Sequence, residues 1–447
     1  MNWLGLGALC LVAAEWLLLG WLSGVGWPSS SASPGGSFWA ARWALRLLVG
    51  SVLTACAQLM LAAVGPGFAA IPLVLVMAAL GAVALRLILR FGQPRDGSSE
   101  ALTPMTLRER SGWLVLALVL LAATARALLV PEAGWDAFSH WGLRARAFAL
   151  VGTIVDAHSE HEYYPPLVPL LEAWLYLHRG AVSIDLGKTI SALIGSAFAV
   201  CLAWHLRLGL QARLAWLAPW FGTAIVVSAT ALLENFWTGQ ADLELTAYFT
   251  LATLAALHWQ RAPGLPWLVQ VALFGAAASL TKFEGLPRVG VVAAVLLVEA
   301  WLTRRWAAHL TAAAVLIVSA GFAALSWTAF ELTHGITPNG EHLGPFQPLA
   351  IGGVLLTLGA VLGGVRTGGG VLTACLAWAV AGRCLFTARL RLISLVVLGE
   401  LAATLLAFLV SSTSPEIEVR TSATRLFEQF LPLALFAGAV GLSKVHL

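Results

Sequence analysis

Charged residues are scarce in this chain of 447 residues, and their scarcity excludes the soluble classes of protein. Asp, Glu, Lys and Arg make up 11% of the sequence, hydrophobic residues make up 59%, and the mean hydropathy is +0.85. Soluble domains hold roughly 25% charged residues. We therefore expect an all-α polytopic membrane bundle of about 12–13 hydrophobic helices, because a helix needs roughly 20 apolar residues to cross a bilayer.

Metal-ligand spacings of cysteine and clustered basic residues are also missing. The five cysteines lie in or beside apolar runs, and none of them forms a CxxC pair. They give no indication of a metal site or a disulfide framework. The net charge of +4 comes from arginines scattered over the loops, so we expect no nucleic-acid partner.

Apolar runs follow one another along the chain and predict its membrane spans. We expect spans at Trp3–Leu22, Leu45–Val64, Phe68–Leu89, Gly112–Val130, Ile184–His205, Leu214–Leu233, Leu243–Trp259, Leu265–Leu280, from 289 to Arg304, Leu392–Val410 and Leu426–Leu442. Two further runs are too short to cross a bilayer. Leu167–Leu177 is expected at the membrane interface, and Val371–Ala381 is expected not to cross fully.

The arginines of the connection Arg90–Ser111 orient the bundle. Arg90, Arg95, Arg108 and Arg110 make this connection cytoplasmic by the positive-inside rule. The following span then leads outward, so the loop 131–166 faces the periplasm or exterior, in a multi-pass protein of the cell inner membrane. We interpret residues 1–111 as accessory transmembrane helices with a cytoplasmic linker, and residues 112–447 as the catalytic domain.

The external loop holds the densest group of ionisable residues in the chain, which makes it the candidate active-site loop. Its ionisable residues are Glu132, Asp136, His140, Arg144, Arg146, Asp156, His158, Glu160, His161 and Glu162. Asp136 precedes a run with helical composition, so it is either a helix N-cap or a general base that takes a proton from an acceptor hydroxyl. The run from His140 to Leu150 is expected to lie at the membrane surface with Arg144 and Arg146 on its polar face.

Two more polar breaks are expected on the same outer side. The break Thr281–Arg288 contains Lys282 and Glu284, which either pair with each other or offer a cation to a phosphate group. Arg425 is expected to open the last helix, with Gln429 on the same face four residues later. Arg425 either snorkels to lipid headgroups or binds the same phosphate.

Other polar and aromatic residues leave two interpretations open. Asp242 and Glu244 either support the site or cap a helix. Trp135, Trp141, Tyr163 and Tyr164 either stack on sugar rings or form an interfacial aromatic belt. His158 and His161 raise the question of a divalent metal, but a third and a fourth ligand are not evident, so we expect no metal and no firm cofactor.

Five segments in order resemble a known family. WDAFSHWGLRARA, HEYYPPLVPLLEAWLY, GQADLELTAYFTLA, LTKFEGL and TRLFEQFLPLAL are similar, in order and spacing, to the bacterial multi-spanning glycosyltransferases of GT-C fold, relatives of the protein O-mannosyltransferases and of the lipid A aminoarabinose transferase. The resemblance covers Gly112–Leu442. It implies a transferase that uses a polyprenyl-phosphate-linked sugar donor and an envelope acceptor (lipid, glycan or protein) and acts among membrane lipids.

The resemblance also implies roles for individual residues. Asp136 takes the place of the catalytic base, Arg144 stands where relatives often have Lys, and Lys282 and Arg425 stand where cations meet the donor phosphate. The supporting or substrate-binding set is His140, Arg144, His161, Tyr163, Tyr164, Asp242, Glu284 and Gln429. Tyr163 and Thr424 replace acidic residues of the family, which leaves the sugar and the acceptor open.

Two other classes of function compete with the transferase. A lipid-linked sugar flippase or transporter also places charges in a helical bundle, but inverted repeats with broken helices at mid-depth would be expected, and the sequence shows no internal repeat. The third class is a non-catalytic assembly partner for envelope synthesis. Such a role does not explain why charged residues recur in this order along the chain.

Overall fold

The computed structural model describes residues 3–25, 36–64, 71–91, 105–131, 134–155, 161–228, 230–336, 351–362, 365–388, 390–410 and 414–444, and all regular elements in them are helices. Among these residues, seven helices are long and apolar enough to cross a membrane, or eight if a bent pair near the C-terminus is one span. Four shorter apolar helices accompany them. The chain is a multi-pass helical membrane protein, as its hydropathy predicts.

The helices of the first half of the chain are α1 (Trp3–Ser23), α2 (Gly36–Val64), α3 (Ile71–Phe91), α4 (Leu107–Leu129), η1 (Ala137–Gly142), α5 (Leu143–Val151), α6 (Leu167–Arg179), α7 (Ile184–Gly187), α8 (Thr189–Gly209), η2 (Ala212–Leu217), α9 (Ala218–Ser228) and α10 (Thr230–Thr238). Those of the second half are α11 (Asp242–Arg261), α12 (Leu265–Thr281), α13 (Gly285–Thr303), α14 (Trp306–Thr333), α15 (Ile351–Leu362), α16 (Val365–Ala381), η4 (Gly382–Phe386), α17 (Arg391–Leu409), α18 (Pro415–Glu428) and α19 (Leu431–Leu442).

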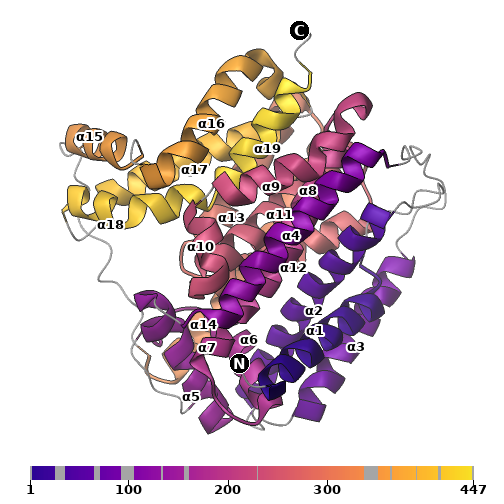
Figure 1. Cartoon of the computed structure of the whole chain (residues 1–447), viewed down its shortest axis with the longest axis vertical. Helices are drawn as coiled ribbons and strands as arrows, with labels where there is room; N and C mark the ends of the chain where they lie inside the picture. Colours follow the sequence, from indigo (N-terminus) through magenta and orange to yellow (C-terminus); the bar gives the residue numbers. More distant parts are fainter. Residues whose placement is uncertain are drawn as a thin grey trace.

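Helix α4 crosses the molecule diagonally and defines its two ends (Figure 1). It begins at a cap in which the Thr106 hydroxyl accepts a hydrogen bond from the backbone N–H of Glu109, 3.1 Å away. It ends at Leu129, with Val130 as the C-cap residue, shortly before Asp136. We name these the Glu109 end and the Asp136 end. Helices α5 and α7 lie at the Asp136 end, so the external loop gathers on one side of the bundle (Figure 1).

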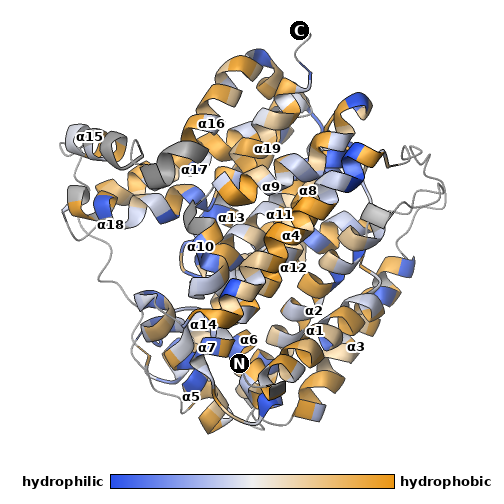
Figure 2. Cartoon of the chain, in the orientation of Figure 1, coloured by the Kyte–Doolittle hydropathy of each residue, from blue (hydrophilic) through white to orange (hydrophobic). Residues whose placement is uncertain are grey.

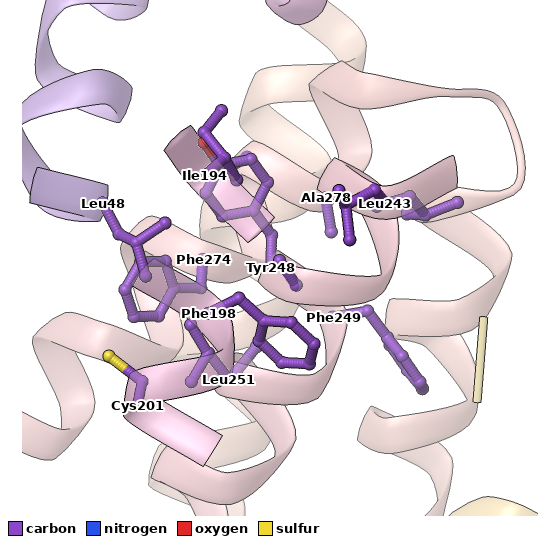
Figure 3. Packing of buried hydrophobic residues seen from close by; sticks show 14 of the residues in the cluster. Leu48, Ile194, Phe198, Cys201, Leu243, Tyr248, Phe249, Leu251, Phe274 and Ala278 are labelled. Atoms are coloured by element: carbon purple, nitrogen blue, oxygen red, sulfur yellow. The ribbon is translucent and has the colours of Figure 1, made fainter. Parts of the chain in front are cut away.

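Helix α11 is the centre of the core. Its residues from Asp242 to Leu257 are all buried. Side chains of α2, α8 and α12 meet it, and Figure 3 shows Leu48, Phe198 and Phe274 around Tyr248. The outward faces of the peripheral helices stay apolar, as in α4 (Figure 2), where Leu114 and Leu121 are exposed. Such faces are suited to contact with lipid, because acyl chains are as apolar as the side chains that face them.

Helix α6, which is expected at the membrane interface, is covered by other helices. Residues Leu167–Tyr176 are all buried, and α6 packs against α1, α2, α5 and α12. At its end His178 Nε2 lies 2.8 Å from Glu15 Oε1 of α1, and the side chain of Gln58 in α2 donates to the carbonyl of Leu170. A helix that is apolar nearly all round belongs inside a bundle, and its short length matters only for a helix that must cross lipid by itself.

One expected span also differs from the structure, whereas the run expected not to cross fully lies in a shorter helix, as expected. The run Leu214–Leu233 is divided among η2, α9 and α10 instead of forming one helix. Pro219 favours a new helix start at Ala218, since proline lacks the N–H that a helix interior needs and fits the first turn. The run Val371–Ala381 lies within the shorter apolar helix α16, which the 3₁₀ turn η4 follows at Gly382.

Candidate active site

Asp136 forms an ion pair with Arg425 of α18, which lies 289 residues further along the chain. Asp136 directly precedes the π-helical turn η1, yet its side chain makes no capping hydrogen bond there. The capping interpretation of Asp136 is therefore wrong. About a third of each side chain is exposed, 33% for both, so a ligand from the surrounding solvent or interface can reach both partners.

Arg425 lies in the last turn of α18, and the expectation that it opens a helix is wrong. The helix starts at Pro415, a residue favoured at the first helical position. Gln429 is the C-cap residue of α18, and its side-chain amide donates to the Asp242 carboxylate. The four-residue spacing thus directs Arg425 and Gln429 to the same polar cluster.

Lys282 bonds to two carboxylates where α12 ends. Its Nζ lies 3.0 Å from Asp242 Oδ1 and 3.5 Å from Glu284 Oε1. The expected pair of Lys282 with Glu284 is thus present, but Asp242, which was not expected as a partner, is closer. Burial lowers the pKa of the Lys282 ammonium, but the two carboxylates outweigh burial and raise the pKa above its usual value. Lys282 is a cation at neutral pH.

Asp242 joins the two pairs into one network. It accepts hydrogen bonds from Lys282 and from Gln429, and Asp242 and Glu284 both act electrostatically on Arg425. We name this network the Asp136 cluster. Its members are Asp136, Asp242, Lys282, Glu284, Arg425 and Gln429. The sequence places these six residues in four separate segments, and the fold brings the segments together.

An aromatic wall borders the Asp136 cluster. The rings of His140 and His161 stack with centroids 3.7 Å apart. Tyr163 stacks on Phe283, between Lys282 and Glu284 in the chain, with centroids 5.8 Å apart, and Tyr164 lies 5.2 Å from Phe283. Aromatic faces beside a polar cluster are suited to sugar rings, which present C–H groups on one face and hydroxyls at the edge.

Burial and nearby charges keep His140 neutral. Burial lowers its pKa most, the neighbouring His161 lowers it further, and Asp136 opposes both, so that the pKa falls to about 4. Lys282 and Arg425 also lower it. His140 Nδ1 lies 2.6 Å from the Ser139 hydroxyl. A neutral imidazole at this position can accept or donate a hydrogen bond without adding charge to the site.

Arg144 lies apart from the cluster, and the expectation that it faces water on a surface helix is wrong. Its side chain is buried, with Nη2 donating to the carbonyl of Glu162 at 3.2 Å. The guanidinium lies over the rings of Phe148 and Trp327, and the charges of Glu162 and Glu331 act on it. These partners replace water around the charge, so Arg144 fastens the external loop to α14.

Three further residues of this region were not predicted from the sequence. Phe283 completes the aromatic wall, and Arg288 forms a buried ion pair with Glu400. Lys188, also buried, donates to the carbonyl of Val130 and so fixes the start of the external loop. Arg288 and Lys188 could have been found from their charge within an apolar chain. Buried ionisable groups in membrane proteins usually have an oppositely charged or polar partner, or a function.

Several loop residues lie outside the part of the chain that the structure describes. They are Glu132, Asp156, His158 and Glu160. The metal question raised by His158 therefore concerns residues beyond this description. Among the described residues, no group of three or more His, Cys, Asp or Glu side chains is arranged to hold a metal ion.

No protein family, curated protein or solved structure matches the chain. The similarity to GT-C glycosyltransferases therefore stays a proposal based on the five sequence segments.

Proposed function

We propose that this protein is a membrane glycosyltransferase of GT-C type that moves a sugar from a polyprenyl-phosphate donor to an envelope acceptor on the outer face of the membrane. One observation carries the proposal: a partly exposed carboxylate, two cations and an aromatic wall from distant parts of the chain meet at one end of a membrane-spanning bundle. A lipid-linked donor needs these features together. The phosphate of the donor needs cations, and its sugar needs a surface that binds a ring. Its polyprenyl tail needs access from the lipid.

The reaction is a single displacement with inversion at the anomeric carbon. The acceptor hydroxyl loses its proton to Asp136, and its oxygen forms a bond to the anomeric carbon. The bond from that carbon to the phosphate oxygen breaks, and its electron pair leaves with polyprenyl phosphate. Asp136 acts as general base, and Lys282 and Arg425 stabilise the charge that develops on the leaving phosphate.

The ion pair between Asp136 and Arg425 links the two halves of this reaction. The cluster holds three carboxylates and two cations, so its formal charge is −1 while Asp136 is ionised. Uptake of the acceptor's proton makes Asp136 neutral and the cluster charge zero. In the same step the leaving phosphate gains a negative charge. Arg425 therefore loses its carboxylate partner when the phosphate needs a cation most.

The other members of the cluster position the cations. Asp242 holds Lys282 and Gln429, and Glu284 makes the second contact to Lys282. Both contacts restrict the ammonium group to the side of the cluster next to Arg425. Fixed cations stabilise a transition state better than mobile ones, because little reorganisation is needed during the reaction.

The test is transfer of labelled sugar by the purified full chain from a mixed pool of polyprenyl-phosphate-linked sugars to membrane acceptors. Asp136→Asn keeps the shape of the side chain and removes the base. We expect it to lower transfer by about 10²–10⁴-fold while polyprenyl phosphate still binds. Glu234→Gln, the same type of change in α10, is the control and keeps full activity.

Two outcomes contradict the proposal in different ways. If Asp136→Asn transfers sugar as fast as wild type, Asp136 is not the base. If the wild-type protein binds polyprenyl-phosphate-linked sugar and transfers none, the flippase is the better interpretation. Movement of labelled donor between the leaflets of proteoliposomes then measures that activity directly.

A further inference from the structure

Arg288 lies one turn into α13, directly after the segment that carries Lys282 and Glu284, and it is 4% exposed. One arm of its guanidinium, Nη1, pairs with Glu400 of α17, whose side chain is 1% exposed. The other arm, Nη2, donates to the backbone carbonyl of Leu426, 3.0 Å away. The guanidinium also lies 5.9 Å from the ring centroids of Phe249 and Phe430. Arg288 thus joins α11, α13 and α17 to the end of α18.

The carbonyl of Leu426 lies where the chain bends. The axis turns by 44° between Ser422–Glu428 and α19. The last carbonyls of a helix have no partner within it, and a cation near them is favourable. Arg425 directly precedes Leu426, and Gln429 follows it by three residues. The two side chains that reach Asp136 and Asp242 therefore project from the turn that Arg288 holds.

The buried pair needs a reason other than stability. Moving two charges out of water costs about as much as their attraction returns, so a buried ion pair is rarely a net stabiliser. Arginine differs from lysine in offering two arms in a fixed plane. Here one arm is held by Glu400 and the other fixes a backbone atom next to Arg425, which is a geometric role.

We propose that Arg288 is a positioning residue that clamps the bend between α18 and α19, so that Arg425 and Gln429 face the other members of the Asp136 cluster. This inference rests on the proposed role of Arg425 in binding the donor phosphate. Arg288 acts through Arg425 and touches no reacting atom. Glu400 holds the guanidinium in the plane in which its second arm reaches Leu426.

The experiment compares Arg288→Lys with Arg207→Lys in the full chain in detergent. Arg207 forms a similar buried pair with Glu109, with Nε 2.6 Å from Oε1, at the opposite end of the bundle. Both changes keep the charge and remove the second arm, but only Arg288→Lys releases Leu426. The two readouts are amide hydrogen exchange at Gln429 and Phe430 and the affinity for polyprenyl phosphate without sugar.

We expect Arg288→Lys to speed exchange at Gln429 and Phe430 by about tenfold or more and to weaken polyprenyl phosphate binding by about tenfold, the effect of losing one hydrogen bond to a charged group. Arg207→Lys changes neither. Unchanged exchange in Arg288→Lys overturns the clamp. If wild type binds no polyprenyl phosphate, the proposed function fails, while the exchange rates still decide whether Arg288 holds the bend.

A second variant covers the case in which Arg288→Lys does not fold. Glu400→Asp keeps the charge but withdraws the carboxylate by one methylene, which draws the guanidinium away from the carbonyl of Leu426. The same two readouts should change in the same direction, by less than in Arg288→Lys. The clamp is overturned if Glu400→Asp has the same amide exchange rates at Gln429 and Phe430 as wild type and the same affinity for polyprenyl phosphate.

Discussion

The two ends of the bundle both carry ion pairs, but the pairs differ in kind. At the Glu109 end each carboxylate meets one arginine: Glu109 pairs with Arg207, and Glu299 accepts two hydrogen bonds from Arg391 at 2.5 and 2.9 Å. At the Asp136 end the pairs share partners, since Asp242 bonds to both Lys282 and Gln429. The first arrangement ties two helices together, whereas the second draws four segments to one cluster.

Exposure also distinguishes one pair at each end. The side chains of Glu109 and Arg207 are 3% and 4% exposed, whereas those of Asp136 and Arg425 are each 33% exposed. A sealed pair can only hold helices in place. A pair that a ligand can reach is able to exchange its partners, and this difference supports the proposal that the Asp136–Arg425 pair, and not the Glu109–Arg207 pair, takes part in the reaction.

Lys282→Met is expected to have the largest effect on stability. It leaves Asp242 buried without its closest cation, which should lower the free energy of unfolding by about 3–5 kcal/mol. Denaturant or thermal unfolding in detergent measures the loss. The double variant Lys282→Met/Asp242→Leu should recover much of it, because the uncompensated charge is gone.

Arg207→Met sharpens the comparison from the other end. It should destabilise the protein about as much as Lys282→Met, because Glu109 is equally buried, yet keep the affinity for polyprenyl phosphate. Lys282→Met should lose that affinity. Equal affinities in the two variants would remove the distinction between the ends.

Arg425→Lys is expected to reduce sugar transfer by about tenfold or more. Lysine keeps the charge but not the planar set of donors with which arginine can bind Asp136 and a phosphate. Initial rates with saturating donor measure the effect. Arg391→Lys, at the Glu109 end, is the matched control, and a similar loss of transfer there would mean that the effect is not specific to the cluster.

Tyr163→Leu tests the aromatic wall and should have a smaller effect. It removes a ring of the aromatic wall, which stacks on Phe283. Contact of one aromatic ring with the sugar should contribute about 0.5–1.5 kcal/mol, so its loss should raise the KM for donor by about two- to tenfold while the maximal rate changes little. A Tyr163→Phe variant keeps the ring and should resemble wild type. An unchanged KM in Tyr163→Leu would favour the interfacial-belt interpretation.

The pH dependence of stability should contain a small contribution from His140. Its pKa is lowered from 6.5 to about 4 in the folded protein. As the pH falls through this window the unfolded chain binds a proton that the folded chain does not, so the free energy of unfolding decreases. Above about pH 6.5 the contribution is fully present. Partial exposure makes it smaller than the shift alone suggests.

The measurement is the unfolding midpoint of wild type and His140→Gln at several pH values between about 4 and 7.5. The variant should lose less stability than wild type as the pH falls. Parallel curves for the two proteins would show that His140 does not titrate in this window.

Much of the fold follows from hydropathy. Long apolar runs predict α1, α4, α8 and α17 closely, because a membrane helix must be apolar over its whole length. The sequence was less informative where a helix is covered by protein. The short length of α6 suggested the interface, but its neighbours bury it, and the run containing Pro219 is divided among three elements.

The cluster was predictable residue by residue but not as pairs. Asp136, Lys282 and Arg425 stand out because ionisable groups are rare in this chain and are expected to be functional. The long-range pairings among the candidate residues did not follow from the sequence. Nothing local links Asp136 to a residue 289 positions away, and the burial of Arg144 depends on the charges of Glu162 and Glu331 around it.

The sequence by itself determined that the chain is a multi-pass helical membrane protein. It also determined which polar residues are too costly to bury in an apolar bundle without partners. Transfer free energies act on each segment independently, so both can be read locally. Only the tertiary structure decided that Asp136 pairs with Arg425, that Lys282 pairs with Asp242, and that Arg288 holds the turn beside them. Such pairings depend on which helix ends meet in space, and packing of the whole bundle sets that.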